Sequence, residues 1–359
     1  MNLKTLTLLF VILTFSYPAK SQNDSIFKIF QFPANSIPRI DGNTDDWADF
    51  PDSYTITNKH FTDDTKKHPL MDTSNLSVKI KVAWVKGLNR LYFLYEASDN
   101  YWDFSRTDLH HDILELIVDG DRSGGPLIDR FHPFKGQIPD WEAYHSFHGV
   151  HAQNYHIYTP AEGQDWCLAW GAQPWIKEMP YANVAYKYNF RPGQSGKLIM
   201  EFWITPFDYA GAEGPQRAVE SLLFENKIIG LGFAIIDFDD VNASENNGFW
   251  NIAKEHKMYG NASFLPPFRL MPLENRYKKP IEAKWDFKII DTEKRIVAFL
   301  DKSEGIINAW KWDFGDGTVS NEENPIHTYI KGGQYIVTLW TEGPGGTSRM
   351  AKVWDVTLK

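Results

Sequence analysis

The stretch Ala309-Trp310-Lys311-Trp312-Asp313-Phe314-Gly315-Asp316-Gly317-Thr318 decides the fold of the last part of this chain. It is followed by Asn-Pro-Ile-His-Thr-Tyr at 324–329 and by Gly-Gln-Tyr-Ile-Val-Thr-Leu at 333–339. The first run predicts a strand that ends in a Gly-Asp-Gly turn, and the last run alternates as a half-buried strand does. Together the three runs predict one half of a β-sandwich.

These runs resemble the signature of the PKD domain, named after polycystic kidney disease. The signature W-x-F-G-D-G is matched at 312–317, P-x-H-x-Y at 325–329, and G-x-Y-x-V-x-L at 333–339. The resemblance implies an immunoglobulin-like sandwich over residues 283–359 that serves as a spacer or a weak adhesion module. Any chemistry is therefore expected upstream of it.

The first 21 residues have the features of a secretory signal peptide. Lys4 is followed by an apolar run from Leu6 to Phe15 and by Ala19-Lys20-Ser21, a small-x-small cleavage site. The apolar run is too short to span a membrane, and no cysteine stands at the cleavage point for a lipid anchor. We therefore expect a secreted or periplasmic protein without membrane insertion.

Composition limits the classes of partner. The chain has 359 residues, enough for two domains, and a formal net charge of −9. An acidic chain without a basic stripe is a poor nucleic-acid binder, although a local cluster of Arg and His can still hold an anionic sugar. The one cysteine, Cys167, excludes an internal disulfide and is expected to be buried. The 14 Trp residues are expected either in the core or as stacking platforms for sugar rings.

Residues 22–270 are expected to form a separate all-β domain, joined by a polar linker at 271–282 to the PKD domain. Alternating runs predict successive strands, and residues 216–225 form the one plausible short helix. The region resembles the family 9 carbohydrate-binding module, whose pattern is matched by Ile-Asp-Gly-Asn-Thr-Asp-Asp-Trp at 40–47, Leu-Tyr-Phe at 91–93, and the segments 112–119 and 121–124. The resemblance implies a β-sandwich, and the fold by itself does not specify a function.

A cluster of His, Tyr and Trp between residues 100 and 180 is the strongest functional signal. On a strand starting at His151, alternation places Tyr155 on one face and both His156 and Tyr158 on the other. His and Tyr can transfer protons, and Arg can hold a carboxylate; this combination suits elimination next to the carboxylate of a uronic acid. The predicted catalytic residues are His148, His151 and Tyr158, and the predicted substrate-binding residues are Arg106, His110, His111, Trp141, Tyr144, His145, Tyr155, His156, Trp166 and Trp170.

In this scheme, His148 or His151 removes the proton, Tyr158 assists at the leaving hydroxyl, and Arg106 holds the carboxylate. The domain order resembles the ulvan oligosaccharide dehydratases of marine polysaccharide-utilisation systems, which implies a hydro-lyase acting on an anionic algal oligosaccharide. No cofactor is expected to be required.

Several alternatives remain open at this point. The cluster could bind sugar without catalysis, bind a transition metal, or belong to a haem or copper module. Arg106 could simply pair with an acidic neighbour at the surface. Asp119 and Asp121 could bind a structural calcium ion, or could cap their own turn through their side chains.

Overall fold

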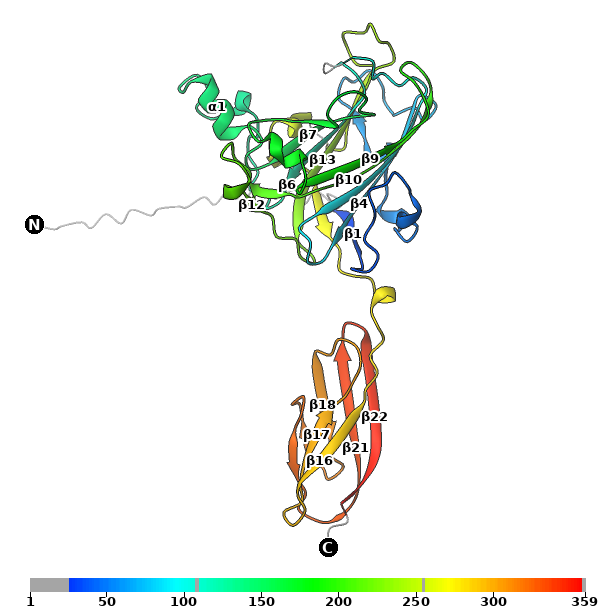
Figure 1. Cartoon of the computed structure of the whole chain (residues 1–359), viewed down its shortest axis with the longest axis vertical. Coiled ribbons are helices and arrows are strands. Elements are labelled where there is room, and N and C mark those ends of the chain that lie inside the picture. Colours follow the sequence, from blue (N-terminus) through cyan, green and yellow to red (C-terminus); the bar gives the residue numbers. More distant parts are fainter. Residues whose placement is uncertain (1–25, 107–109, 254–255, 357–359) are drawn as a thin grey trace, which may run out of the picture.

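The computed structural model describes residues 26–106, 110–253 and 256–356, and the predicted signal peptide lies outside these ranges. The described chain forms two β-sandwich domains and contains a single α-helix, as the ribbon shows (Figure 1). The all-β prediction is therefore confirmed.

The first domain contains the strands up to Leu270 and the helix α1 (Asp140–Phe147). Its strands are β1 (Phe27–Phe32), β2 (Ile56–Thr57), β3 (Thr62–Asp63), β4 (Leu76–Val85), β5 (Leu91–Asp99), β6 (Ile113–Asp119), β7 (Gln153–Tyr158), β8 (Cys167–Ala169), β9 (Ala182–Lys187), β10 (Gly196–Ile204), β11 (Phe207–Tyr209), β12 (Val219–Glu220), β13 (Ile228–Asp237), β14 (Gly248–Asn251) and β15 (Pro267–Leu270).

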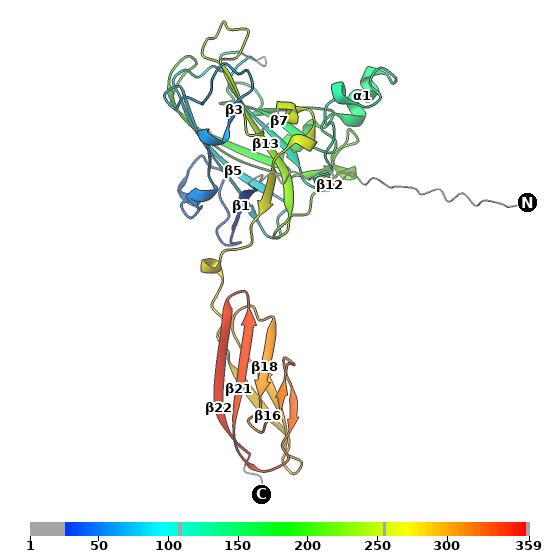
Figure 2. The ribbon, with the colours of Figure 1, turned by 180° about the vertical axis from the view of Figure 1, so that it is seen from behind.

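Strand β1 joins two antiparallel sheets. Its first half pairs in parallel with β15 and its second half with β4. One sheet runs β8-β7-β6-β13-β15, and the other runs β4-β5-β10-β9. Figure 2 shows β1, β5 and β13 from behind. The two sheets meet through a shared apolar core, in which the ring of Phe93 on β5 lies 6.2 Å from that of Phe233 on β13.

The Ile-Asp-Gly motif at 40–47 is held by a buried carboxylate on β10. Glu201 Oε2 accepts the backbone N–H groups of Asp41 at 3.2 Å, Gly42 at 2.7 Å and Asn43 at 3.1 Å, and Oε1 accepts Trp47 Nε1–H at 2.8 Å. Gly42 has φ +75°, a conformation that favours glycine. The motif is thus a structural clasp in which one fully buried acid satisfies four donors.

Strands β6 and β7 separate core from pocket by simple alternation. Leu114, Leu116 and Tyr155 face the core, while Glu115 and His156 are directly paired in register on the other face. The predicted alternation between residues 155 and 156 is therefore confirmed. It gives one sheet an apolar inner surface and a polar outer surface.

The predicted helix at 216–225 is wrong. This segment contains a 3-10 turn (Pro215–Arg217) and β12, which pairs with β11. Two of its apolar side chains, Leu222 and Phe224, are exposed, so the segment has no buried apolar stripe of the kind that stabilises an amphipathic helix. The single α-helix lies instead at α1, within the histidine-rich region.

The second domain packs a three-stranded sheet, β16-β17-β20, against a four-stranded sheet, β19-β18-β21-β22. Its strands are β16 (Trp285–Asp291), β17 (Ile296–Asp301), β18 (Ala309–Asp313), β19 (Val319–Ser320), β20 (Ile326–Thr328), β21 (Gly333–Gly343) and β22 (Gly346–Val356). A short 3-10 turn, Asn275–Tyr277, lies between the two domains.

The PKD-like signature residues build the core and one turn of this second domain. Trp312 is fully buried, and Tyr329 Oη donates to Phe314 O at 3.2 Å. The His327 ring stacks on Phe314 with centroids 4.2 Å apart, and its Nε2 lies 2.8 Å from Asp316 Oδ2. These contacts are structural, which explains the spacing of the signature without any chemistry.

Candidate functional site

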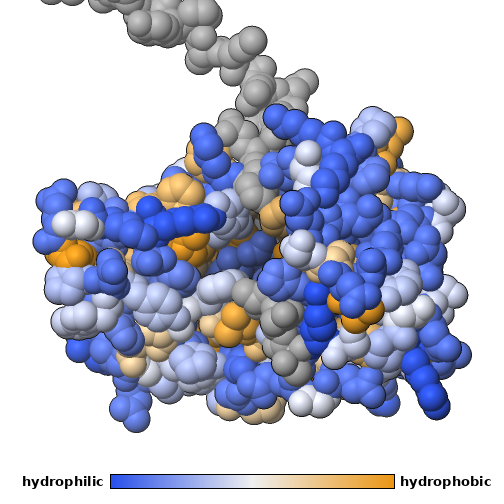
Figure 3. All heavy atoms as spheres, turned by 90° about the horizontal axis from the view of Figure 1, so that it is seen from above, coloured by the Kyte–Doolittle hydropathy of each residue, from blue (hydrophilic) through white to orange (hydrophobic). Residues whose placement is uncertain are grey.

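A pocket of about 510 Å³ opens on the polar face of the sheet that contains β6 and β7. One face of the first domain, seen in Figure 3, is mainly hydrophilic and has a hollow with hydrophobic patches beside it. We call the 510 Å³ space the sheet-face pocket; it is lined by Glu115, Ile128, Asp129, Arg130, His148, Asn154, His156, Trp170, Ile236, Phe249 and Tyr259.

His148 and Asp129 form a carboxylate–imidazole pair at this pocket. His148 follows the end of α1. Its Nδ1 lies 3.4 Å from Asp129 Oδ1 and 3.3 Å from the backbone N–H of the same residue, which donates to it. The imidazole is 5% exposed, and within the described ranges its Nε2 has no hydrogen-bond partner. Burial lowers the pKa of His148, and the neighbouring Asp129 partly opposes that effect. For Nε2 to act as a general base, the neutral imidazole must instead carry its proton on Nδ1, where the Asp129 carboxylate can accept it.

Glu115 supplies a buried carboxyl group to the same pocket. It is 5% exposed, and its Oε1 accepts Asn154 Nδ2–H at 2.9 Å. Burial raises the pKa of Glu115 to about 7, so a substantial fraction keeps its proton near neutral pH. Glu115 can therefore donate a proton, a role for which an ordinary surface glutamate is ionised too early.

His156 faces Glu115 across the strand pair and remains neutral. Burial, followed by the charge of His111, lowers its pKa to about 3. Its Nε2 is buried and has no partner among the residues that the structure describes. The Trp170 ring lies 6.1 Å from the His156 ring and 5.9 Å from the His148 ring, so it packs between the two imidazoles.

Arg130 brings positive charge to the rim of the pocket. Its guanidinium lies 4.4 Å from the centre of the Tyr259 ring, and the residue is exposed. Arg130 is thus held over an aromatic face while its donors remain accessible to a carboxylate. Arg130, Asp129, Glu115 and Asn154 were not among the residues predicted from the sequence. The one available signal was the single acidic residue, Glu115, inside the otherwise apolar run 113–118.

Three predicted site residues, His148, His156 and Trp170, meet in the sheet-face pocket. Tyr158 shares a sheet face with His156, at 6.2 Å between ring centroids, and stacks on buried His111 at 4.7 Å. Neither Tyr158 nor His111 lines the pocket. The Tyr144 ring packs 4.6 Å from the His148 ring, so Tyr144 supports the imidazole from α1.

The predicted alternative base, His151, lies elsewhere. Together with Trp141 and His145 it lines a separate hollow of about 370 Å³, which also includes Tyr209 and Glu213. His151 Nδ1 lies 3.2 Å from the backbone oxygen of Asp208, and the ring is exposed. The structure therefore separates the two predicted bases, His148 and His151, into different sites.

Arg106 does not reach the sheet-face pocket. Its Nη2 donates to Asp103 Oδ2 at 2.8 Å and its Nη1 to Ala243 O at 2.9 Å, so the protein itself occupies these donors. This geometry fits the alternative in which Arg106 pairs with an acidic neighbour, although that neighbour, Asp103, is buried rather than at the surface. The carboxylate-holding role predicted for Arg106 is not supported by this arrangement. His110 lines a neighbouring pocket of about 470 Å³, which adjoins the sheet-face pocket at Ile236.

Two predicted substrate contacts belong to the protein interior. Tyr155 is fully buried in the core between the sheets, so a sugar cannot reach it. Trp166 packs against that core and donates its indole N–H to Lys177 O at 3.0 Å. The reason is the strand alternation itself, which turns residue 155 away from the face that carries residue 156. Cys167 is buried and unpaired, as expected.

The Asp119–Asp121 turn caps itself. Asp119 Oδ2 accepts Gly124 N–H at 2.9 Å, and Asp121 Oδ1 accepts Ser123 N–H at 2.9 Å. Burial raises the pKa of Asp119 to about 6. This arrangement fits the self-capping alternative, and calcium binding at this turn stays a prediction.

Within the described residues, no helix is long and apolar enough to cross a membrane. Residues 278–358 match the family model of the PKD domain. The chain is also 46% identical over 141 residues to the collagenase ColA of Clostridium perfringens; the match covers 32% of this chain, but the chain spans only 13% of the collagenase.

Solved structures resemble each domain separately. A family 9 carbohydrate-binding module from Caldicellulosiruptor kristjanssonii, in complex with cellotriose, is 14% identical, with a TM-score of 0.42, covering 70% of this chain and 98% of that one. The PKD1 domain of Vibrio anguillarum Epp is 26% identical, with a TM-score of 0.21, covering 23% of this chain and 99% of that one. The chain therefore carries a PKD domain over residues 278–358, preceded by a larger β-sandwich that contains the sheet-face pocket.

Proposed function

We propose that the protein is a carbohydrate-active hydro-lyase that removes water from a uronic acid of an anionic oligosaccharide, such as a fragment of ulvan. The pairing of His148 with Asp129 beside the protonatable Glu115 carries this proposal. These groups supply a base and an acid in one pocket, and elimination of water needs both.

The proposed reaction assigns one role to each group. His148 Nε2 takes the proton from the carbon next to the sugar carboxylate, and the electron pair of that C–H bond forms the new C=C bond. The C–O bond to the neighbouring hydroxyl breaks, and Glu115 donates its proton so that the hydroxyl leaves as water. Arg130 holds the carboxylate and stabilises the negative charge that develops on it. Glu115 replaces Tyr158 in this scheme because Glu115 lines the pocket.

The substrate is proposed to be anionic and sugar-like on the basis of the rim. Arg130 offers paired donors to a carboxylate, while the rings of Trp170 and Tyr259 offer apolar faces to the C–H side of a sugar. The signal-like first residues support action in the periplasm or outside the cell. On this proposal the PKD domain is a spacer or an adhesion module.

The alternative function is capture of the same class of oligosaccharide without catalysis. It is favoured by the aromatic and arginine rim, which a binding protein would also use. The two functions differ in what they require of His148: a base must lose and gain a proton, whereas a binding residue only needs to donate or accept a hydrogen bond.

The test is mass spectrometry of lyase-generated ulvan oligosaccharides incubated with the purified protein. The proposal expects the loss of one water and new ultraviolet absorbance from a conjugated double bond. His148→Asn should abolish this change, while His151→Asn, the matched change in the separate hollow, should preserve it. Binding with unchanged masses would favour the capture protein, and full activity of the His148→Asn variant would overturn the assigned base.

A further inference from the structure

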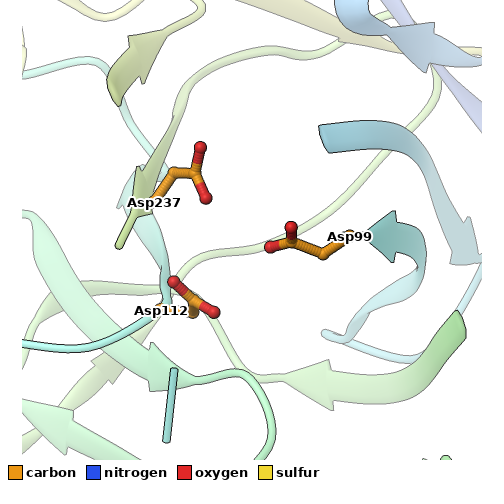
Figure 4. A group of neighbouring side chains, drawn as sticks. All are labelled: Asp99, Asp112 and Asp237. Atoms are coloured by element: carbon orange, nitrogen blue, oxygen red, sulfur yellow. The ribbon is translucent and has the colours of Figure 1, made fainter. Parts of the chain in front are cut away.

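A second polar cluster lies where the two sheets of the first domain come together. Asp99 is the last residue of β5, Asp112 directly precedes β6, and Asp237 is the last residue of β13. Their carboxyl groups point toward one another (Figure 4), and one oxygen of each lies within 4.8 Å of the others. The cluster therefore joins strands of both sheets, and none of its members lines the sheet-face pocket.

The three carboxyl groups are buried, and within the described residues no basic side chain forms an ion pair with them. The exposed fractions are 5% for Asp99, 3% for Asp112 and 2% for Asp237. No salt bridge to any of the three is found within residues 26–106, 110–253 and 256–356. Buried charges in proteins are normally paired or bound to a metal, so three adjacent buried carboxyl groups are unusual.

Hydrogen bonding satisfies only part of the cluster. Asp112 accepts Asp103 N–H at 2.7 Å and Phe238 N–H at 2.9 Å, one on each oxygen. Asp99 Oδ1 accepts Tyr101 N–H at 3.0 Å. These bonds fix the direction of the carboxyl groups.

One carboxylate oxygen of Asp237 is buried without a hydrogen-bond donor among the described residues. Asp237 Oδ2 accepts Asn75 Nδ2–H at 3.0 Å, but the buried Oδ1 of the same residue has no partner among the described residues. A buried oxygen without a donor is costly unless something outside the protein satisfies it. The residue that carries this oxygen, Asp237, belongs to the cluster.

We propose that Asp99, Asp112 and Asp237 bind a calcium ion that ties the ends of β5, β6 and β13 together. The donor set consists of carboxylate oxygens, which suit hard cations rather than zinc or copper. One oxygen of each residue lies within 4.8 Å of the others, so a single Ca²⁺ with bonds of about 2.4 Å can reach all three. Magnesium demands a near-octahedral shell and gives up its bound water reluctantly, so three protein carboxylates suit it less well than calcium.

The proposed calcium site does not depend on the proposed reaction, because the ion would stabilise the folded domain and would not take part in catalysis. Burial raises the pKa of Asp112 and of Asp237 well above the usual value, so without a cation these groups hold protons. A bound divalent ion would replace those protons, and it would stabilise the folded state in proportion to its affinity.

The experiment uses the whole chain, dialysed against a chelator and then titrated with calcium chloride. We expect calorimetry to detect a calcium ion whose binding depends on Asp237, and Tm to rise by about 5 °C or more at saturation. Magnesium at the same concentration should give a smaller shift. A wild-type protein that neither binds calcium nor changes Tm would overturn the proposal.

Variants locate the ion. Asp237→Asn and Asp99→Asn each keep the side-chain shape, and each should weaken this binding at least tenfold and remove its Tm response; circular dichroism checks that the variants fold. Asp165→Asn, at an exposed carboxylate outside both acidic sites, is the matched control and should bind as the wild type does. Wild-type calcium affinity in both folded cluster variants would assign the ion to another site and overturn the proposal. The two cluster positions are independent, so failure of one variant to fold leaves the other as the test.

Discussion

The Nδ1 atom of His148 lies 3.4 Å from Oδ1 of Asp129, in a pocket that also contains the buried carboxyl of Glu115. The histidine and the aspartate are separated by a helix in the sequence, and α1 brings the imidazole back to the turn that carries Asp129. This pairing holds the ring in one orientation and favours its protonated form as a proton arrives. It is the geometric basis of the proposed catalysis.

Replacing Asp129 tests the pair without removing the imidazole. Asp129→Asn keeps the size of the side chain but removes the charge that stabilises protonated His148, so we expect kcat to fall by about 10²-fold or more with little change in KM. Steady-state kinetics on the oligosaccharide measures this split. Asp165→Asn, at an exposed surface pair with Lys177, is the control and should have wild-type kinetics. A wild-type kcat for Asp129→Asn would contradict the role of the pair.

The pH dependence of stability tests the burial of Glu115. Its pKa rises from 4.5 to about 7 on folding, so the folded state holds the proton more tightly, and stability should fall as pH rises between these values. At about 1.4 kcal/mol per pH unit, the loss is about 3 kcal/mol. Glu115→Gln cannot ionise and should lack this loss. Urea unfolding at pH 5 and pH 8 compares the two proteins; parallel pH profiles would refute the assignment.

Arg130 and Arg106 make a matched pair for substrate affinity. Arg130→Gln removes the charge at the pocket rim, so KM for the anionic oligosaccharide should rise about tenfold or more through the loss of a charge-assisted contact. Arg106→Gln removes an arginine whose Nη1 and Nη2 already donate to Ala243 and Asp103, and KM should stay near the wild-type value. Isothermal titration calorimetry should show the same difference in affinity: the Arg130→Gln variant should bind the oligosaccharide more weakly, and the Arg106→Gln variant should bind it as the wild type does. A raised KM for the Arg106→Gln variant, together with a wild-type KM for the Arg130→Gln variant, would instead show that Arg106 holds the carboxylate.

The clasp around Glu201 predicts a large effect on stability. In Glu201→Gln, an amide N–H must face either the indole N–H of Trp47 or the three backbone N–H groups that the carboxylate accepts. Two donors cannot bond each other, so we expect a loss of about 2–4 kcal/mol in the free energy of unfolding. Trp47→Phe removes one donor and packing volume but leaves the carboxylate bonded to the backbone. Denaturant unfolding that shows no loss for Glu201→Gln would exclude the clasp.

Trp312 tests whether the PKD domain is needed for turnover. Trp312→Ala leaves a large void in the small core of this domain, with an expected cost of about 3–5 kcal/mol. Calorimetry should show a lowered transition for this domain, while product formation by the first domain stays at the wild-type rate. Loss of turnover together with an unchanged transition of the first domain would mean that the PKD domain takes part in the site.

The sequence by itself determined the features that depend on local pattern. The alternation of apolar and polar residues predicted strands and placed Tyr155 and His156 on opposite faces of one of them. The turn and core residues between 312 and 339 predicted the sandwich of the PKD domain. The helix predicted at 216–225 was wrong, because a short pattern of polar and apolar residues does not show whether its apolar side chains will be buried.

Only the tertiary structure decided which residues share a site. His148 and His151 are three residues apart in the sequence, yet they line different hollows because the end of α1 and the following turn direct them apart. Glu115 joins His148 because strand pairing across β6 and β7 sets which side chains face the pocket. Likewise, Asp99, Asp112 and Asp237 meet only where the two sheets come together. Such contacts between distant residues depend on sheet order and register, which local patterns do not encode.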